Sequence, residues 1–189
     1  MPTDTRQLLA NIKDSVDTAT ALAAARVAVQ QGDGITTAIC GGLALHLYGF
    51  VRATQDVDLL ASAVLEVTPE KELSFGGISF TVQVAGRPVM VDWIVRNDFF
   101  RAFYETALAE AQDLGDGLRI VTPEWLAVLK YIAGRGKDQI DLLWLLQQPQ
   151  LVDRAQVLAH LEHIMGPLGA VFPQRELRRL FVQADATSE

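Results

Sequence analysis

Between residues 35 and 95, short apolar runs alternate with breaks rich in glycine and polar residues, a pattern typical of a sheet. We expect strands at residues 35–40, from Asp56 onward, and at 78–84 and 89–95. The last two flank Ala85-Gly86-Arg87-Pro88, so they predict a hairpin with a four-residue turn. This part of the chain therefore predicts a β-rich core.

Helical periodicity dominates before and after this region. Residues 5–31 carry apolar side chains at helical spacing and end at Gly32-Asp33-Gly34. A short helix is expected at 43–48, and a brief strand at 118–121. Thr122-Pro123 is a typical helix start. The remaining predicted helices are 98–112 (with Asp98 as its cap), 124–133, 138–147, 153–165 and 174–183.

Together these patterns predict an α/β (α+β) protein: a mixed β-sheet flanked by helices, with a C-terminal helical part. The composition changes near Thr122, which divides the chain into an α/β domain at 1–122, with its N-terminal helix at 5–31, and a helical region at 123–189.

Composition narrows the classes of function. Half of the 189 residues are hydrophobic, and the net charge of −7 argues against a broad surface for duplex DNA. The single cysteine, Cys40, permits no internal disulfide. The first residues lack the order of a signal peptide, and no apolar run approaches membrane length. We expect a cytoplasmic protein without a membrane partner.

Asp56 and Asp58 are the strongest candidates for chemistry. Because side chains alternate along a strand, both face one way while Val57 faces the core, and their carboxylates lie roughly 6–7 Å apart. Their repulsion costs about 2.5 kcal/mol at an effective dielectric near 20. A hard cation such as Mg²⁺ between them would relieve it. Asp92 is a further lone carboxylate in an apolar strand.

These residues form a recognisable signature. Gly41-Gly42, thirteen residues, Asp56-Val57-Asp58-Leu59 and the later Asp92 resemble the signature of the DNA polymerase β-like nucleotidyltransferases. The segment 130–141 is similar to one in the AbiEii-type and related minimal, toxin-related members. The resemblance implies that a nucleoside triphosphate gives its nucleotidyl group to an acceptor hydroxyl, with two Mg²⁺ or Mn²⁺ ions as cofactors.

The resemblance also implies roles for particular residues. The catalytic and metal-binding carboxylates would be Asp56, Asp58 and Asp92, and Asp92 would also help to deprotonate the acceptor. The residues that would bind substrate are Gly41, Gly42, Arg52, Thr54, Lys130, Arg135, Lys137 and Asp138. Glycines at a strand-to-helix turn let backbone N–H groups approach phosphates. Arg52 and Thr54 either contact phosphates or steady their loop, and Lys137, expected on a loop, would meet the β- or γ-phosphate.

The acceptor stays open: RNA such as tRNA, a protein or a small molecule, with a cognate antitoxin as a partner if the enzyme is of the toxin type. Two other classes also stay open. One is a non-catalytic member of the fold that binds a nucleotide or a partner protein. The other is a nucleotide-sugar glycosyltransferase that uses Asp-x-Asp with Mn²⁺, which leaves the Gly-Gly turn unexplained.

Other polar residues have simpler interpretations. His46 is expected in the core or at a helix cap. His160, His163 and Glu162 share helical spacing, and a solvated helix face is favoured over zinc binding because no third ligand converges. The arginines of the last helix are expected on its exposed face, with a partner or RNA contact left open: Arg175, Arg178 and Arg179.

Overall fold

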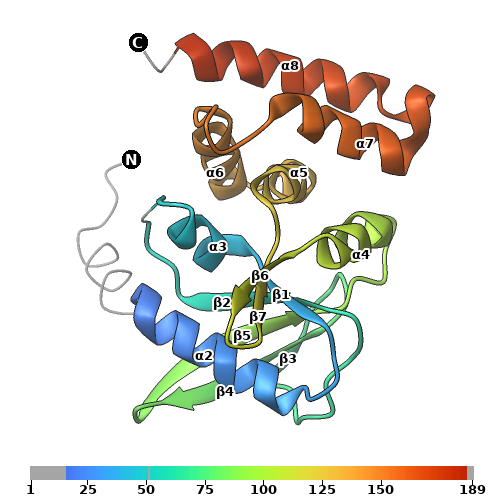
Figure 1. The fold of residues 1–189 in the computed structure, drawn as a ribbon. Helices are drawn as coiled ribbons and strands as arrows, with labels where there is room; N and C mark the ends of the chain where they lie inside the picture. Colours follow the sequence, from blue (N-terminus) through green and yellow to red (C-terminus); the bar gives the residue numbers. More distant parts are fainter. Residues whose placement is uncertain (1–15, 51, 187–189) are drawn as a thin grey trace, which may run out of the picture. The chain divides into compact units, whose positions relative to one another are not determined.

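The computed structural model describes residues 16–50 and 52–186. These residues form seven strands: β1 (Thr37–Ile39), β2 (Asp56–Ala61), β3 (Lys71–Glu72), β4 (Ile78–Val84), β5 (Arg87–Ile94), β6 (Gln112–Gly115) and β7 (Leu118–Ile120). They also form seven helices: α2 (Thr18–Gln31), α3 (Gly41–Leu47), α4 (Arg101–Ala109), α5 (Pro123–Ala133), α6 (Gly136–Leu146), α7 (Arg154–Gly169) and α8 (Val171–Ala186) (Figure 1). The predicted α/β class with a mixed sheet is confirmed.

The chain divides into two compact units. The first, Met1–Asp98 with Ala111–Ile120, holds every described strand, and we call it the sheet unit. The second, Phe99–Glu110 with Val121–Glu189, holds α4 to α8, and we call it the helical unit. No helix in the described part of the chain is long and apolar enough to cross a bilayer.

The sheet has the strand order β3-β4-β5-β2-β1-β7-β6, which places β2 in the middle. β2 pairs in parallel with β5 and antiparallel with β1. β4 and β5 form the predicted hairpin, but its turn is only Ala85-Gly86, both with positive φ (49° and 78°). Arg87 and Pro88, predicted in the turn, instead pair with Val84 and Gln83. A two-residue turn of this kind matches the twist of the flanking strands.

Helix α2 lies across the sheet and contacts β2, β4, β5 and β7 (Figure 1). Its buried side is made of small residues, Ala21, Ala24, Ala25 and Ala28, which let the helix approach the strands closely. The helix begins at Thr18 and not at residue 5 as one continuous helix, because Asp17 is extended and its side chain accepts from the backbone N–H of Thr20. The predicted stretch 5–15 lies outside the described residues.

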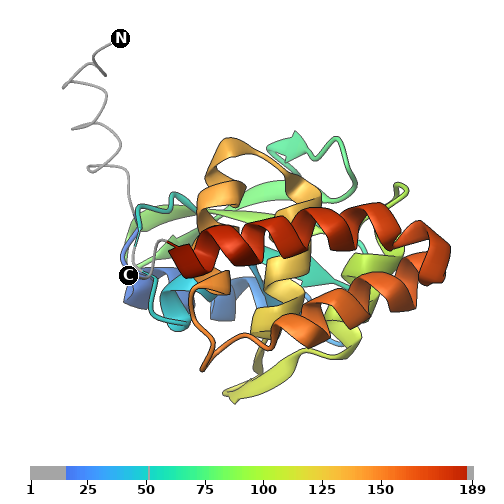
Figure 2. The same cartoon turned by 90° about the horizontal axis from the view of Figure 1, so that it is seen from above.

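In the helical unit, α5 packs against α4, α6 and α7, while α8 packs on α6 and α7 (Figure 2). The predicted start of α5 is confirmed: the Thr122 hydroxyl accepts from the N–H of Trp125, and Pro123 occupies the first turn. His160 on α7 is not simply solvated, since its ring stacks on Trp125 at 4.0 Å between centroids. Burial lowers the pKa of His160.

The predicted helix 98–112 is too long at both ends. Asp98 forms an ion pair with Arg96 instead of capping a helix, and α4 begins at Arg101. Gln112 already belongs to β6, which pairs with β7. The cause is the turn between these strands: Asp116 adopts a positive φ of 52° between two glycines, so the chain reverses and a hairpin replaces the last helical turn.

Candidate active site

Three carboxylates converge on the middle of the sheet. Asp56 and Asp58 project from one face of β2, and Asp92 projects from the adjacent strand β5. Because β2 and β5 run in parallel with Asp58 directly opposite Asp92, one oxygen from each of the three carboxylates lies within 4.8 Å of the others. All three residues are half-buried. Within residues 16–50 and 52–186, this is the cluster of acidic, histidine or cysteine side chains that could hold a metal ion.

The apolar residues between the carboxylates fix this orientation. Val57 and Leu59 are fully buried on the opposite face of β2. A shift of one residue in the register would bury both aspartates in the apolar core and expose the valine and the leucine. The hydrophobic effect therefore holds the carboxylates on the site face, and the prediction that Asp56 and Asp58 point the same way agrees with the pairing.

Ser79 orients the third carboxylate, and the sequence analysis did not identify this residue. Ser79 on β4 lies opposite Asp92 and donates a hydrogen bond of 2.6 Å from Oγ to Asp92 Oδ1. The missed signal is the length of the hairpin turn. The expected four-residue turn would have placed Thr81 opposite Asp92, whereas the observed two-residue turn places Ser79 there.

The Gly41-Gly42 turn lies directly against Asp58. The backbone N–H of Cys40 donates to the carbonyl of Asp58 at 3.0 Å, which ties the start of α3 to β2. Gly41 has a φ of 59°, and a Cβ there would lie 1.7 Å from Asp58 Oδ2. A Cβ on Gly42 would lie 2.5 Å from the hydroxyl of Thr54. Both glycines are thus required by close approach, and the first also by its backbone conformation.

Arg52 and Thr54 lie beside this turn. Thr54 is buried, and its hydroxyl donates to the carbonyl of Asp56 at 3.3 Å. The side chain of Arg52 donates from Nη1 to the carbonyl of Ala53 at 3.0 Å. Its Nη2 lies 3.6 Å from the position that a Cβ on Gly42 would occupy. Thr54 therefore steadies the loop, while the Arg52 guanidinium borders the glycine turn.

The other predicted substrate-binding residues lie in the helical unit, where three of them form one ion-pair cluster. Lys130 Nζ is 3.0 Å from Asp138 Oδ1 and 2.7 Å from Asp141 Oδ2, and Arg135 donates to both oxygens of Asp138. Both aspartates are fully buried, and Lys130 is nearly so. Burial alone would raise the pKa of Asp138, but the hydrogen bond from Arg135 and the charge of Lys130 outweigh it and hold that pKa below its usual value.

Lys137 is exposed, as expected, but it does not lie on a loop. Helix α6 begins at Gly136, so Lys137 is in its first turn. The apolar residues of this helix predict a buried stripe of Ile140, Leu143, Trp144 and Leu146, which is confirmed for Leu146 and wrong for Ile140. Ile140 is 64% exposed, and the buried side of α6 consists of Asp138, Asp141, Leu142, Leu145 and Leu146. The cluster around Lys130 explains the difference, because its ion pairs allow two aspartates to face the core.

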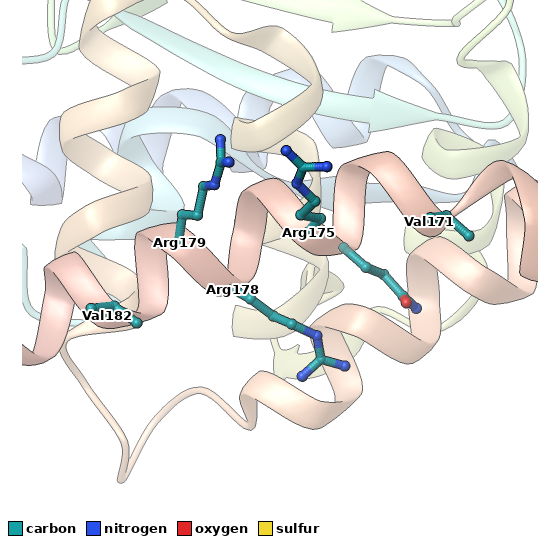
Figure 3. Close-up of a pocket in the computed structure, with 6 residues that line it drawn as sticks. Val171, Arg175, Arg178, Arg179 and Val182 are labelled. Carbon is teal, nitrogen blue, oxygen red and sulfur yellow. The ribbon is translucent and has the colours of Figure 1, made fainter.

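The three arginines of α8 are exposed, as predicted. Arg175 and Arg179 point to one side of the helix and Arg178 to the other (Figure 3). Together with Val171, Gln174 and Val182 they line a shallow hollow of about 410 Å³. No carboxylate of the described chain forms an ion pair with them.

Comparison with known proteins gives a likeness to solved structures and no match in sequence. No protein-family model matches the chain, and no curated protein sequence matches it. Among solved structures, the chain is similar to an antigenic nucleotidyltransferase-like protein from Paracoccidioides brasiliensis, with a TM-score of 0.46 and 17% sequence identity. The match covers 87% of this chain and 90% of the other.

The Lys130 cluster predicts a large loss of stability on removing its shared cation. Lys130→Met should lower the free energy of unfolding by about 3–5 kcal/mol, because Asp141 loses its 2.7 Å ion pair while staying buried. Lys137→Met, at the exposed lysine nearby, is the matched control and should change little. Urea unfolding measures both variants.

The same experiment has a pH signature. Since the folded-state pKa of Asp138 is depressed, the stability it contributes is present above its unfolded pKa and is lost as the pH falls through the folded value. The difference between the wild type and Lys130→Met should therefore be largest near neutral pH and shrink in acid. A difference that does not change with pH would mean that the lysine stabilises through packing alone.

A side chain at position 41 is predicted to clash with the carboxylate of Asp58. In Gly41→Ala the new Cβ meets Asp58, whereas Gly34→Ala is a control with similar positive φ (78°) and no heavy atom within 4 Å. Both variants carry the left-handed backbone strain of about 1–2 kcal/mol. Gly41→Ala should lose about 1–3 kcal/mol more, measured by urea unfolding, because Asp58 must move. Equal losses would mean that the turn does not constrain the carboxylate.

Proposed function

We propose that this protein is a metal-dependent nucleotidyltransferase that moves a nucleoside monophosphate from a nucleoside triphosphate to an acceptor hydroxyl. The observation that carries the proposal is the convergence of three carboxylates, from neighbouring parallel strands, against a turn whose first glycine cannot carry a side chain. The sequence signature that contains these residues supports the same reaction.

The carboxylates suit Mg²⁺ or Mn²⁺. They offer hard oxygen donors within 4.8 Å of one another, and like charges held so close are relieved by a divalent cation. Asp56, Asp58 and Asp92 would hold two such ions. When bound, these ions would stabilise the charge on the entering and leaving oxygens of an in-line displacement.

The chain's own groups would orient the reactants. Ser79 donates a 2.6 Å hydrogen bond to one oxygen of Asp92, and this bond holds the carboxylate group in one orientation. We assign to Asp92 the second task of accepting the proton of the acceptor hydroxyl. A base held by a neighbouring donor keeps the geometry that proton transfer needs.

The triphosphate would lie along the glycine turn. Gly41 and Gly42 begin α3 directly beside Asp58 and Thr54, and the Arg52 guanidinium borders Gly42. Helix α3 has only seven residues, so we assign the binding of phosphate charge to the Arg52 side chain and not to a helix terminus. Lys137 is proposed to assist on the side of the departing pyrophosphate, and the Lys130 cluster, with Arg135 and Asp138, to hold the start of α6 that carries Lys137.

The acceptor is proposed to be RNA such as tRNA, a protein or a small molecule, and a cognate antitoxin would be the partner of a toxin-type enzyme. The experiment that separates these is incubation with each labelled nucleoside triphosphate, Mg²⁺ and total cellular RNA or protein. Label in one macromolecule identifies the acceptor class. Binding of a triphosphate with no labelled product in any fraction would favour the non-catalytic, nucleotide-binding alternative.

Replacing Asp58 is predicted to abolish activity without lowering the stability of the metal-free protein. Asp58→Asn should abolish transfer and the metal-dependent binding of triphosphate. Without metal it should melt at the same temperature as the wild type or higher, because it removes repulsion among three close carboxylates. Calorimetry with Mn²⁺ and triphosphate, and thermal melting, measure the two effects.

The matched control is Asp33→Asn, an exposed aspartate of the same unit. It should leave both binding and melting unchanged. If Asp58→Asn melts lower than the control by about 4 °C or more without metal, the Asp58 carboxylate stabilises the fold and the proposed role is wrong.

Lys137 gives a prediction on turnover. If its ammonium balances the charge on departing pyrophosphate, Lys137→Ala should reduce turnover at least about tenfold, about 1.4 kcal/mol in barrier, with little change in melting temperature. Lys71→Ala, at an exposed lysine on β3, is the control and should keep wild-type turnover. Turnover of Lys137→Ala equal to that of Lys71→Ala would show that Lys137 takes no part in the reaction.

A further inference from the structure

His46 joins three segments of the sheet unit that are separate in sequence. It lies in the last turn of α3. Its Nδ1 is 3.2 Å from the hydroxyl of Thr18, the first residue of α2. Its Nε2 makes a short contact with the backbone carbonyl of Arg52, which precedes β2. One imidazole therefore links α2, α3 and the loop that carries the arginine beside the glycine turn.

The contacts determine the tautomer. A carbonyl oxygen only accepts hydrogen bonds, so the short contact with Arg52 requires a proton on Nε2. The backbone N–H of Arg52 is also near Nε2, but at 3.4 Å, and the shorter contact decides the assignment. In the neutral ring Nδ1 then accepts from the Thr18 hydroxyl. Both ring nitrogens are thus used, one to hold the loop and one to hold the ring.

Two contacts position the loop that carries Arg52. Residues 52–55 belong to no helix or strand. Further along, the backbone N–H of Val16 donates to the carbonyl of Thr54 at 2.8 Å, which fixes the end of the loop nearest β2. The contact from His46 fixes the other end, at Arg52 itself.

This placement decides where the guanidinium lies. Arg52 Nη2 is 3.6 Å from the position of a Cβ on Gly42, so the cation lies against the glycine turn. A long side chain held at its backbone loses less freedom when it binds an anion than one on an untethered loop.

We propose that His46 is a positioning residue that sets the Arg52 guanidinium over the Gly41-Gly42 turn to receive the triphosphate tail. The inference rests on the function proposed above. It goes further by assigning a role to a histidine outside the carboxylate cluster, and it predicts that this residue acts only through Arg52.

The test is a double-mutant cycle read by calorimetry, with Mn²⁺ and each of the four nucleoside triphosphates and monophosphates as probes. His46→Ala should weaken the binding of the preferred triphosphate by about tenfold and leave monophosphate binding nearly unchanged, because the guanidinium serves the phosphate tail. Arg52→Gln should show the same selectivity. In the Arg52→Gln background, His46→Ala should add no further loss.

Two further variants separate positioning from folding. His46→Gln keeps an N–H that can reach the Arg52 carbonyl and should recover most of the affinity, so it keeps the test decisive if His46→Ala fails to fold. Thr18→Val removes the outer hydrogen bond alone and should give a smaller loss of the same kind. His163→Ala, at an exposed histidine of the helical unit, should have no effect.

The outcomes also distinguish this proposal from the function on which it rests. If the wild type binds no triphosphate with Mn²⁺, the proposed function fails and the role of His46 fails with it. If the wild type binds triphosphate but His46→Ala and His46→Gln bind it equally well, only the role of His46 is wrong. Losses that add in the double variant, or that are equal for mono- and triphosphate, would show that His46 does not act through Arg52.

Discussion

The parallel pairing of β2 with β5 is the constraint on which the candidate site depends. It places Asp58 directly opposite Asp92, and the two-residue alternation of β2 adds Asp56 to the same face. The pairing is secured by apolar side chains on the reverse face, where Val57, Leu59 and Val91 are fully buried. A repulsive arrangement of carboxylates is thus held by the free energy of burying the residues between them.

The protein accommodates aspartates in two different ways. In the helical unit, Asp138 and Asp141 are fully buried, and Lys130 and Arg135 supply the opposite charges. Removing one member of such a cluster leaves a buried charge uncompensated. In the sheet unit the clustered carboxylates are half-buried and within reach of solvent. The first arrangement suits a permanent ion-pair network, whereas the second suits a site that exchanges a ligand.

The sequence predicted the local structure correctly where the alternation of apolar and polar residues, or a residue typical of turns and helix starts, determined it. The strand 78–84, the placement of Asp56 and Asp58 on one face, and the start of α5 at Thr122 all follow from short-range rules, and the structure agrees with them. Contacts between distant segments were not predictable in this way. Periodicity treats a charged residue as exposed, so it assigned Ile140 to the buried side of α6 in place of the ion-paired aspartates. The partner Ser79 was missed because one turn was judged two residues too long.

Backbone contacts, more than contacts between side chains, determine where the groups of the candidate site lie. The hydrogen bond from the Cys40 N–H to the Asp58 carbonyl brings the start of α3 against β2. At that distance a side chain on Gly41 and the carboxylate of Asp58 would occupy the same space, so the glycine and the aspartate require each other. The same close contact between α3 and β2 places Gly42 against the hydroxyl of Thr54. The carbonyl of Thr54 in turn accepts a hydrogen bond from the backbone N–H of Val16, which precedes α2. Sheet, turn and loop are therefore fixed relative to one another before any ligand binds, and this is the preorganisation that a phosphate-transfer site needs.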